Sequence, residues 1–144
     1  MNNKILPDVV RYPVTHRLPA SATVRDAALL MSDKSVGVVL VVDGETLCGI
    51  FSERDLTSRV VANGLNPAQT PLREVMTAEV VTIRPDGTAE EALSLMQAYH
   101  CRHLPVMENG TILAMVSIRD LYRAMNAQLS YDLKEVQSFV FNPY

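Results

Sequence analysis

Two long stretches of this chain can be aligned with each other without a gap. Residues 23–60 match residues 88–125 at a constant offset of 65. The identical pairs are Thr23 and Thr88, Ala27 and Ala92, Leu30 and Leu95, Met31 and Met96, Val41 and Val106, Thr46 and Thr111, and Ser52-x-Arg54-Asp55-Leu56 with Ser117-x-Arg119-Asp120-Leu121. An internal repeat of this kind predicts two copies of one supersecondary unit, which stack to bury their apolar faces.

Each unit is predicted to contain an amphipathic helix near its start. Apolar residues recur at helical spacing, as Val24, Ala27, Ala28 and Met31 in the first unit and as Ala89, Ala92, Leu93 and Met96 in the second. This spacing places them on one stripe of a helix. Thr23 and Thr88 precede the stripes, and an acidic residue follows each of them three positions later, so both threonines are expected to cap their helices.

Two strands and a second helix are predicted to follow in each unit. In the first unit the strands span 36–42 and 46–51, with Asp43-Gly44 between them, and the helix spans 53–62. In the second unit the strands span 103–107 and 111–116, with Asn109-Gly110 between them, and the helix spans 118–127. A leading strand is also predicted in each unit, at 14–18 and at 80–83. The Asp-Gly and Asn-Gly pairs mark the hairpin turns. Such dipeptides supply the positive φ angles of a tight hairpin. The fold class is therefore α/β, with two strand-helix-strand-strand-helix repeats. Because neither unit has enough apolar surface to stand alone, we expect them to pack about a pseudo-two-fold axis, through their sheets or their helix pairs.

The repeat also sets the expected organisation of the chain. It comprises an N-terminal segment (1–13), the first repeat (14–63), a linker rich in helix breakers (64–74), the second repeat (75–127) and a C-terminal helical tail (128–144). The tail carries the apolar residues Leu129, Tyr131, Leu133, Val136, Phe139, Val140 and Phe141. They are expected to make an amphipathic helix with an apolar end, which packs on its own domain or forms a dimer contact rather than docking an unrelated partner.

Composition excludes several classes of protein. A net charge of −3 and a pI near 5.5 argue against a general nucleic-acid binder, which needs a basic face. No apolar run approaches the roughly 20 residues that span a bilayer, and the first residues lack the apolar core of a signal peptide, so a cytoplasmic protein is expected. Cys48 and Cys101 are predicted to be reduced thiols, because two cysteines in apolar stretches do not make a disulfide framework.

The chain shows no machinery for catalysis. It has no Gly-rich phosphate loop, no His-Glu-x-x-His and no nucleophile placed beside a base, so we expect it not to be an enzyme. His100, Cys101 and His103 are close in sequence, but residues on a strand alternate between faces and a fourth ligand is missing. No metal site is therefore predicted.

The repeated unit resembles the CBS domain, a family whose members occur as tandem pairs called Bateman modules. The resemblance rests on Gly49-Ile50-Phe51-Ser52-Glu53-Arg54-Asp55, Ala114-Met115-Val116-Ser117-Ile118-Arg119-Asp120, Val75-Met76-Thr77, the run from Val80 to Asp86, and Arg102-His103-Leu104-Pro105-Val106. It covers about residues 14–127. The second unit departs from the family at Ala114, where Gly is common, and the first has no counterpart of Pro105. The family commonly binds AMP, ADP, ATP or an adenosine-containing dinucleotide such as NAD between its two units.

The resemblance implies two clefts and assigns residues to each. The first would use Ser52 and Asp55 at the ribose, Ile50, Val80 and Val81 around the adenine, and Arg102, His103 and Arg119 at the phosphate. The second cleft, expected to bind more weakly, would use Ser117 and Asp120, with Arg54 and His16 as its cations. The alternative is that both Ser-x-x-Asp motifs are only capping boxes at the start of helices.

Two further functions compete with nucleotide sensing. The chain could be a structural dimerisation module whose clefts hold no ligand, or, less favoured, an enzyme acting on a nucleotide. The family resemblance implies a regulatory module that forms a homodimer, in which two tandem pairs stack as a disc of four units. No effector domain is visible, so the regulated protein is expected to be another chain.

Overall fold

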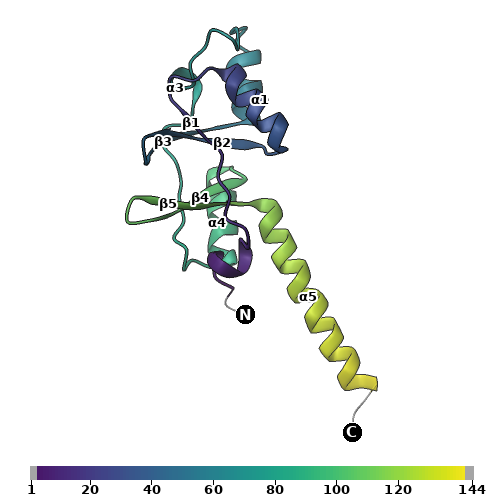
Figure 1. The fold of residues 1–144 in the computed structure, drawn as a ribbon. Coiled ribbons are helices and arrows are strands. Elements are labelled where there is room, and N and C mark those ends of the chain that lie inside the picture. The colour runs from purple at the N-terminus through teal and green to yellow at the C-terminus, as the bar shows by residue number, and fades with distance from the viewer. Residues whose placement is uncertain (1–2, 142–144) are drawn as a thin grey trace.

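Two units, each a small sheet covered by helices, are stacked on each other (Figure 1). The computed structural model describes residues 3–141 of the 144-residue chain and the side chains through residue 137. The first unit comprises β1 (Arg17–Pro19), α1 (Val24–Lys34), β2 (Val38–Asp43), β3 (Thr46–Ser52), α2 (Glu53–Asp55) and the π-helical turn η2 (Leu56–Val61). The second unit comprises α4 (Ala89–Tyr99), β4 (His103–Glu108), β5 (Thr111–Ser117) and α5 (Ile118–Phe141). Two short helical segments, η1 (Ile5–Val9) and α3 (Leu72–Val75), precede the units.

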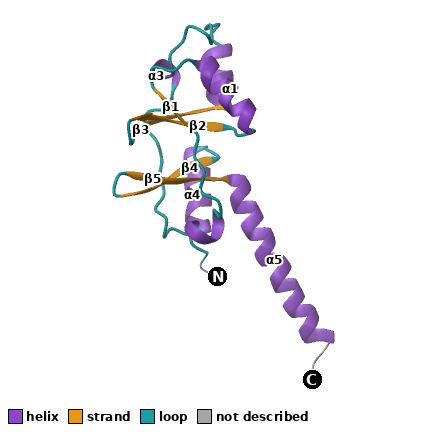
Figure 2. Ribbon diagram, viewed as in Figure 1, coloured by secondary structure: helices purple, strands orange, loops and turns teal. Residues whose placement is uncertain are grey.

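The two sheets lie face to face in the middle of the molecule, and α1 and α4 cover their outer faces (Figure 2). In the first sheet β1 runs parallel to β2, and β2 is antiparallel to β3. The second sheet is the antiparallel pair of β4 and β5. The predicted α/β architecture of two stacked repeats is confirmed, and of the two packing modes left open it is the sheets that meet.

The caps and apolar stripes of the first helices form as predicted. The Thr23 hydroxyl accepts the backbone N–H of Asp26 at 3.1 Å, and the Asp26 carboxylate accepts the N–H of Thr23 at 2.9 Å. Thr88 caps α4 in the same way through the N–H of Glu91 at 3.1 Å. The stripes are buried in two separate cores, with Val24, Ala27 and Met31 in the first and Ala92 and Met96 in the second.

The hairpin turns match the prediction in the second unit and differ by one residue in the first. Asn109 and Gly110 connect β4 to β5 with φ of 51° and 79°. In the first unit Asp43 still pairs with Thr46, so the turn consists of Gly44, with φ of 61°, and the residue after it. The predicted Asp43-Gly44 turn is therefore wrong, because Asp43 is the last residue of β2.

The predicted leading strand at 80–83 does not form, and Pro105 explains why. In the first unit the N–H of Leu40 donates to the carbonyl of His16 at 2.8 Å, which extends the pairing next to β1. Pro105 occupies the position equivalent to Leu40 and has no N–H to donate. Only Ile83 is therefore held against β4, through a single bridge to Val106.

The segment that precedes each unit packs into the core of the other unit. The N–H of Ile5 bonds to the carbonyl of Gly87 at 2.8 Å, and Ile5, Val9 and Val10 lie in the core of the second unit. Conversely, the N–H of Leu72 bonds to the carbonyl of Ala22 at 2.8 Å, and Leu72 lies in the core of the first unit. Each unit is thus completed by the segment that precedes the other.

The C-terminal tail continues the last helix of the second unit. A single helix, α5, extends from Ile118 to Phe141 and projects away from the stacked sheets (Figure 1). Residues 129–137 are exposed, so the expectation that the tail packs on its own domain is wrong for these residues. The side chains of Phe139, Val140 and Phe141 and the end of the tail at 142–144 lie outside the described part. None of the helices that the structure describes has an apolar stretch long enough to cross a membrane.

Candidate functional site

A cleft of about 1000 Å³ opens between the two units and the N-terminal segment. Val36 and Gly37, which lead into β2, and Val38, its first residue, form one wall. The end of β5 and the start of α5 form the opposite wall, with Met115, Ser117, Arg119 and Asp120 among others. Residues 14–16 also line the cleft. Both repeats and the leading segment therefore contribute to this one cavity.

The predicted site residues fall into this cleft in a different grouping from the one expected. Arg102, His103 and Arg119 line it together with Ser117 and Asp120, rather than with Asp55. The reason is the register of the second hairpin, which places His103 directly opposite Ser117 on the neighbouring strand. Arg102, His103 and Arg119 therefore lie beside the Ser-x-x-Asp motif of the second unit, whereas the expected grouping placed them beside Asp55.

Of the remaining predicted residues, some line the cleft and the others lie outside it. His16 lies in the cleft, as expected for the site around Asp120. Ile50, Val80 and Val81 do not line it, although Met115, which is equivalent to Ile50, does. Ser52 and Asp55 are also outside it and form a separate polar cluster.

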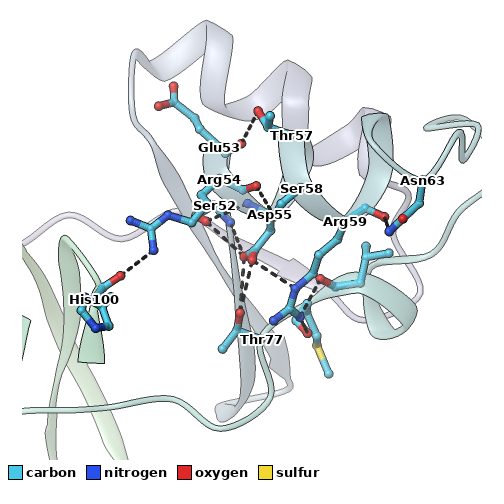
Figure 3. Close-up of polar contacts among 12 residues, drawn as sticks. Ser52, Glu53, Arg54, Asp55, Thr57, Ser58, Arg59, Asn63, Thr77 and His100 are labelled. Carbon is cyan, nitrogen blue, oxygen red and sulfur yellow. Dashed lines mark hydrogen bonds and ion pairs between the residues drawn. The ribbon is translucent and has the colours of Figure 1, made fainter. Parts of the chain in front are cut away.

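Asp55 is enclosed by partners from its own unit and from the connecting segment 62–88 (Figure 3). This segment between η2 and α4 is longer than the linker expected at 64–74, and it is called the linker below. Its carboxylate accepts the Ser52 backbone N–H at 3.0 Å and the Ser52 hydroxyl at 3.1 Å. The Thr77 hydroxyl donates to the same carboxylate at 3.4 Å, and the Arg59 Nε lies 3.5 Å from it. Asp55 is 7% exposed. Its hydrogen-bonding capacity is therefore already used within the chain, and the capping-box geometry is present.

Asp120 has the same cap but remains open to the cleft. Its carboxylate accepts the Ser117 N–H at 2.8 Å, and its own N–H donates to the Ser117 hydroxyl at 3.1 Å. Arg123, an exposed side chain of the same helix, reaches it at 3.3 Å. The side chain of Asp120 is 21% exposed, against 9% for Asp55. This carboxylate and the Ser117 hydroxyl can still bind hydroxyl groups of a ligand.

The linker explains why only one of the two motifs is open. Thr77 and Ile50 exchange backbone hydrogen bonds of 2.8 and 3.0 Å, so the linker crosses the end of β3 and covers Asp55. Gly49 permits this crossing, because a Cβ at this position would lie 2.8 Å from the Thr77 carbonyl oxygen. The N-terminal segment makes no such bridge to Met115 among the described residues. Tyr12, which is the counterpart of Thr77 at the offset of 65, is 86% exposed.

Arg54 connects the two units instead of lining the second cleft as predicted. Its guanidinium donates to the carbonyl of His100 at 2.6 Å (Figure 3). His100 is the left-handed residue that ends α4, with φ of 53°, two positions before Arg102. Arg54 therefore holds the turn that leads into the cationic start of β4.

The charges in the cleft favour an anion with polar neighbours. Four guanidinium groups line it, from Arg11, Arg102, Arg119 and Arg123, against the three carboxylates of Asp8, Glu53 and Asp120. Burial lowers the pKa of His103 below 6.5, although the carboxylates of Asp120 and Glu53 partly oppose this shift. His103 therefore lines the cleft as a neutral imidazole near pH 7, able to donate one hydrogen bond and to accept another.

Neither a reactive thiol nor a metal centre is apparent in the described region. Burial raises the pKa of Cys101, which keeps it protonated near neutral pH. Both cysteines are free thiols. Among residues 3–137, no group of three histidine, cysteine, aspartate or glutamate side chains is arranged to hold a metal ion.

Fold and site together define a tandem repeat module with a polar cleft between its halves, and known proteins share this arrangement. The family model of the CBS domain matches residues 8–62 and 72–127. The chain belongs to the CBS-domain family and carries two CBS domains in tandem. Proteins of this kind are regulatory modules of the signal-transduction type.

Individual relatives support the assignment over most of the chain. A CBS domain-containing protein of Arabidopsis thaliana is 37% identical over 110 residues, which cover 75% of this chain and 20% of the relative. This chain thus spans about a fifth of that relative. A CBS-domain protein of Burkholderia ambifaria described as a signal-transduction protein has a TM-score of 0.82 at 32% identity, covering 86% of this chain and 94% of its own. A CBS domain protein of Pyrobaculum aerophilum, solved as a complex with AMP, has a TM-score of 0.76 at 25% identity, covering 91% and 99%.

Proposed function

We propose that this chain is a regulatory module that binds an adenosine-containing nucleotide in the cleft around Asp120. The observation that carries the proposal is the combination of an open Ser117–Asp120 pair with Arg102, His103 and Arg119 in a single cavity of about 1000 Å³. A cavity of this size is at the upper end of small-molecule sites. The AMP complex of the Pyrobaculum relative supports the choice of ligand class.

Each part of the nucleotide has a matching chemical group. Asp120 would accept hydrogen bonds from the ribose hydroxyls, since an ionised carboxylate is a strong acceptor. Val36, Val38 and Met115 offer apolar surface for a flat purine. Arg102 and Arg119 would bind phosphate, because the planar guanidinium matches phosphate oxygens in pairs. The cluster around Asp55 would have a structural role, because its carboxylate is covered by Thr77 and Arg59.

Titration calorimetry with AMP, ADP, ATP, NAD and adenosine tests the proposal. We expect Asp120→Asn to weaken binding of the preferred nucleotide by about tenfold or more, because a charge-assisted hydrogen bond contributes roughly 1.5–3 kcal/mol. Asp55→Asn is the matched control, and it should leave the affinity within about twofold of wild type provided the variant is folded. Equal loss from both substitutions would contradict the assignment to one cleft.

The second candidate is a structural module that binds no nucleotide. It predicts no stabilisation of the folded chain by any of these compounds, whereas a ligand that binds only the folded state raises the midpoint of thermal unfolding. We further propose binding without turnover, in a cytoplasmic protein that regulates another chain. Following ATP and NAD by chromatography during incubation tests this point, since product in excess of the protein would identify an enzyme. A homodimer of stacked tandem pairs is likewise proposed from the family resemblance, and light scattering tests it.

A further inference from the structure

The exposed half of α5 carries a continuous apolar stripe that its own chain does not cover. The stripe consists of Tyr122, Met125, Leu129, Leu133 and Val136, which are 39–59% exposed. At 3.6 residues per turn these five side chains lie within one narrow face of the helix. The isolated end of a helix this short is marginal in water, and apolar residues on one face are typical of a helix with a partner.

The spacing of this stripe is symmetric about Leu129. Its members are separated by three, four, four and three residues, so the pattern reads the same in both directions. Two copies of α5 packed antiparallel around a two-fold axis at Leu129 would match the stripe at every position. Tyr122 would meet Val136 of the second copy, Met125 would meet Leu133, and Leu129 would meet itself. A two-fold interface requires this kind of self-complementarity.

The charges along α5 distinguish antiparallel from parallel pairing. Residues 118–128 carry two arginines and one aspartate, whereas residues 129–137 carry two carboxylates and one lysine. An antiparallel pair places the half with excess positive charge beside the half with excess negative charge. It also opposes the two helix dipoles. A parallel pair would place like halves together.

The area of the stripe is sufficient for a dimer contact. Five large side chains that are about half exposed contribute on the order of 500 Å² per chain, so two copies would bury on the order of 1000 Å², the lower limit of specific interfaces. The remaining polar residues of the helices would form a rim and add to this area.

Other features of α5 favour a second copy over a lipid surface. A membrane-binding helix carries lysine and arginine beside its apolar face. Asp132 and Glu135 instead flank the stripe of the projecting half, with Lys134 as its one basic residue among 129–137. The contact would also leave most of the nucleotide cleft accessible, because the cleft residues Arg123, Ala124 and Ala127 lie on a different face of α5 from the stripe.

We propose that α5 is a self-association surface, through which two copies of this chain pair antiparallel about Leu129, a contact separate from the stacked-pair homodimer proposed above. Light scattering on the purified chain at tens of micromolar tests the surface. Leu129→Glu should halve the measured mass and raise the dissociation constant at least about tenfold, because the substituted residue occurs twice at the centre of a symmetric contact.

Leu133→Glu and Tyr131→Glu form a matched pair of variants. Both residues are about equally exposed, at 54% and 56%, but only Leu133 belongs to the stripe. Leu133→Glu should reduce the mass as Leu129→Glu does, and Tyr131→Glu should not. Because all three side chains are exposed in the single chain, none of these substitutions is expected to prevent the chain from folding. Unchanged mass in Leu129→Glu, or equal effects of the matched pair, would overturn the proposal.

Disulfide trapping tests the direction of pairing. In a background with Cys48→Ser and Cys101→Ala, Leu129→Cys should crosslink with itself under mild oxidation. Met125→Cys and Leu133→Cys should crosslink efficiently only when the two variant chains are mixed. Efficient self-crosslinking of Met125→Cys would show a parallel pair and overturn the antiparallel arrangement.

Discussion

The Thr77 hydroxyl lies 3.4 Å from the carboxylate of Asp55 and ties the linker to the first unit. At the equivalent Asp120, the described part of the chain supplies only Ser117 and Arg123, both from the second unit itself. Two motifs with the same sequence pattern thus have different surroundings. One is part of the internal structure, and the other is open to a cleft.

This difference predicts unequal effects of the two aspartates on stability. Asp55→Asn should lower the free energy of unfolding by roughly 1–3 kcal/mol, because it weakens buried contacts to Ser52, Thr77 and Arg59. Asp120→Asn should cost less, because its carboxylate is more exposed. Urea denaturation of both variants measures the difference. A larger loss in Asp120→Asn would be inconsistent with these surroundings.

Gly49 is predicted to be required by the linker crossing. Gly49→Ala would place a Cβ 2.8 Å from the Thr77 carbonyl and from the Met76 sulfur. We expect a loss of roughly 1–3 kcal/mol, as for overpacking elsewhere in protein cores. The second unit has Ala114 at the equivalent position, so the reverse change, Ala114→Gly, is the control and should cost only about 1 kcal/mol. Thermal unfolding of the two variants would test the prediction, and a Gly49→Ala variant as stable as wild type would refute it.

Arg102 is predicted to contribute to phosphate binding and not to binding of the nucleoside. Arg102→Gln should weaken binding of the preferred nucleotide about tenfold and leave adenosine nearly unchanged. Arg25→Gln removes the same charge from the exposed surface of α1 and controls for net charge. Calorimetry at constant ionic strength measures both. A parallel loss for adenosine would mean that Arg102 acts by shaping the cleft.

His103 is predicted to make stability depend on pH. Burial lowers its pKa in the folded protein below the 6.5 of an unfolded histidine; Asp120 and Glu53 act against this shift, and Arg102 and Arg119 act with it. Below about pH 6.5 the unfolded chain therefore binds more protons at this residue, so its contribution to stability is present above that pH and is lost as the pH falls. Between about pH 7.5 and about pH 5.5, the free energy of unfolding should decrease less in His103→Gln than in wild type. The difference in slope should correspond to the uptake of at most one proton on unfolding. Denaturation at several pH values checks this, and identical slopes would argue against it.

Leu72 is predicted to stabilise the first unit although it precedes the second. It is completely buried in the first core, so Leu72→Ala should cost roughly 2–5 kcal/mol. Leu65, in the same linker, is 40% exposed, and Leu65→Ala should cost much less. Hydrogen exchange should locate the loss of protection in α1 and β2. Loss confined to the second unit would contradict the exchanged segments.

Much of the fold follows from local sequence. The offset of 65, the helical stripes and the threonine caps are short-range patterns, so they determine the repeat and its elements before any packing is known. Pro105 makes the same point for the strand expected at 80–83. Its missing N–H prevents a full strand at 80–83, and this signal was present in the sequence.

Which of the two Ser-x-x-Asp motifs is open to a ligand depends on tertiary structure. Sequence comparison makes Asp55 and Asp120 equivalent, because it compares each motif with its copy and not with the segments that reach it through space. Only the folded chain shows that the linker crosses β3 to cover Asp55, while Tyr12 leaves Asp120 open. The exchange of segments between the units has the same origin. Ile5 and Leu72 each contact a core distant in sequence, and such contacts depend on the path of the chain rather than on local propensity.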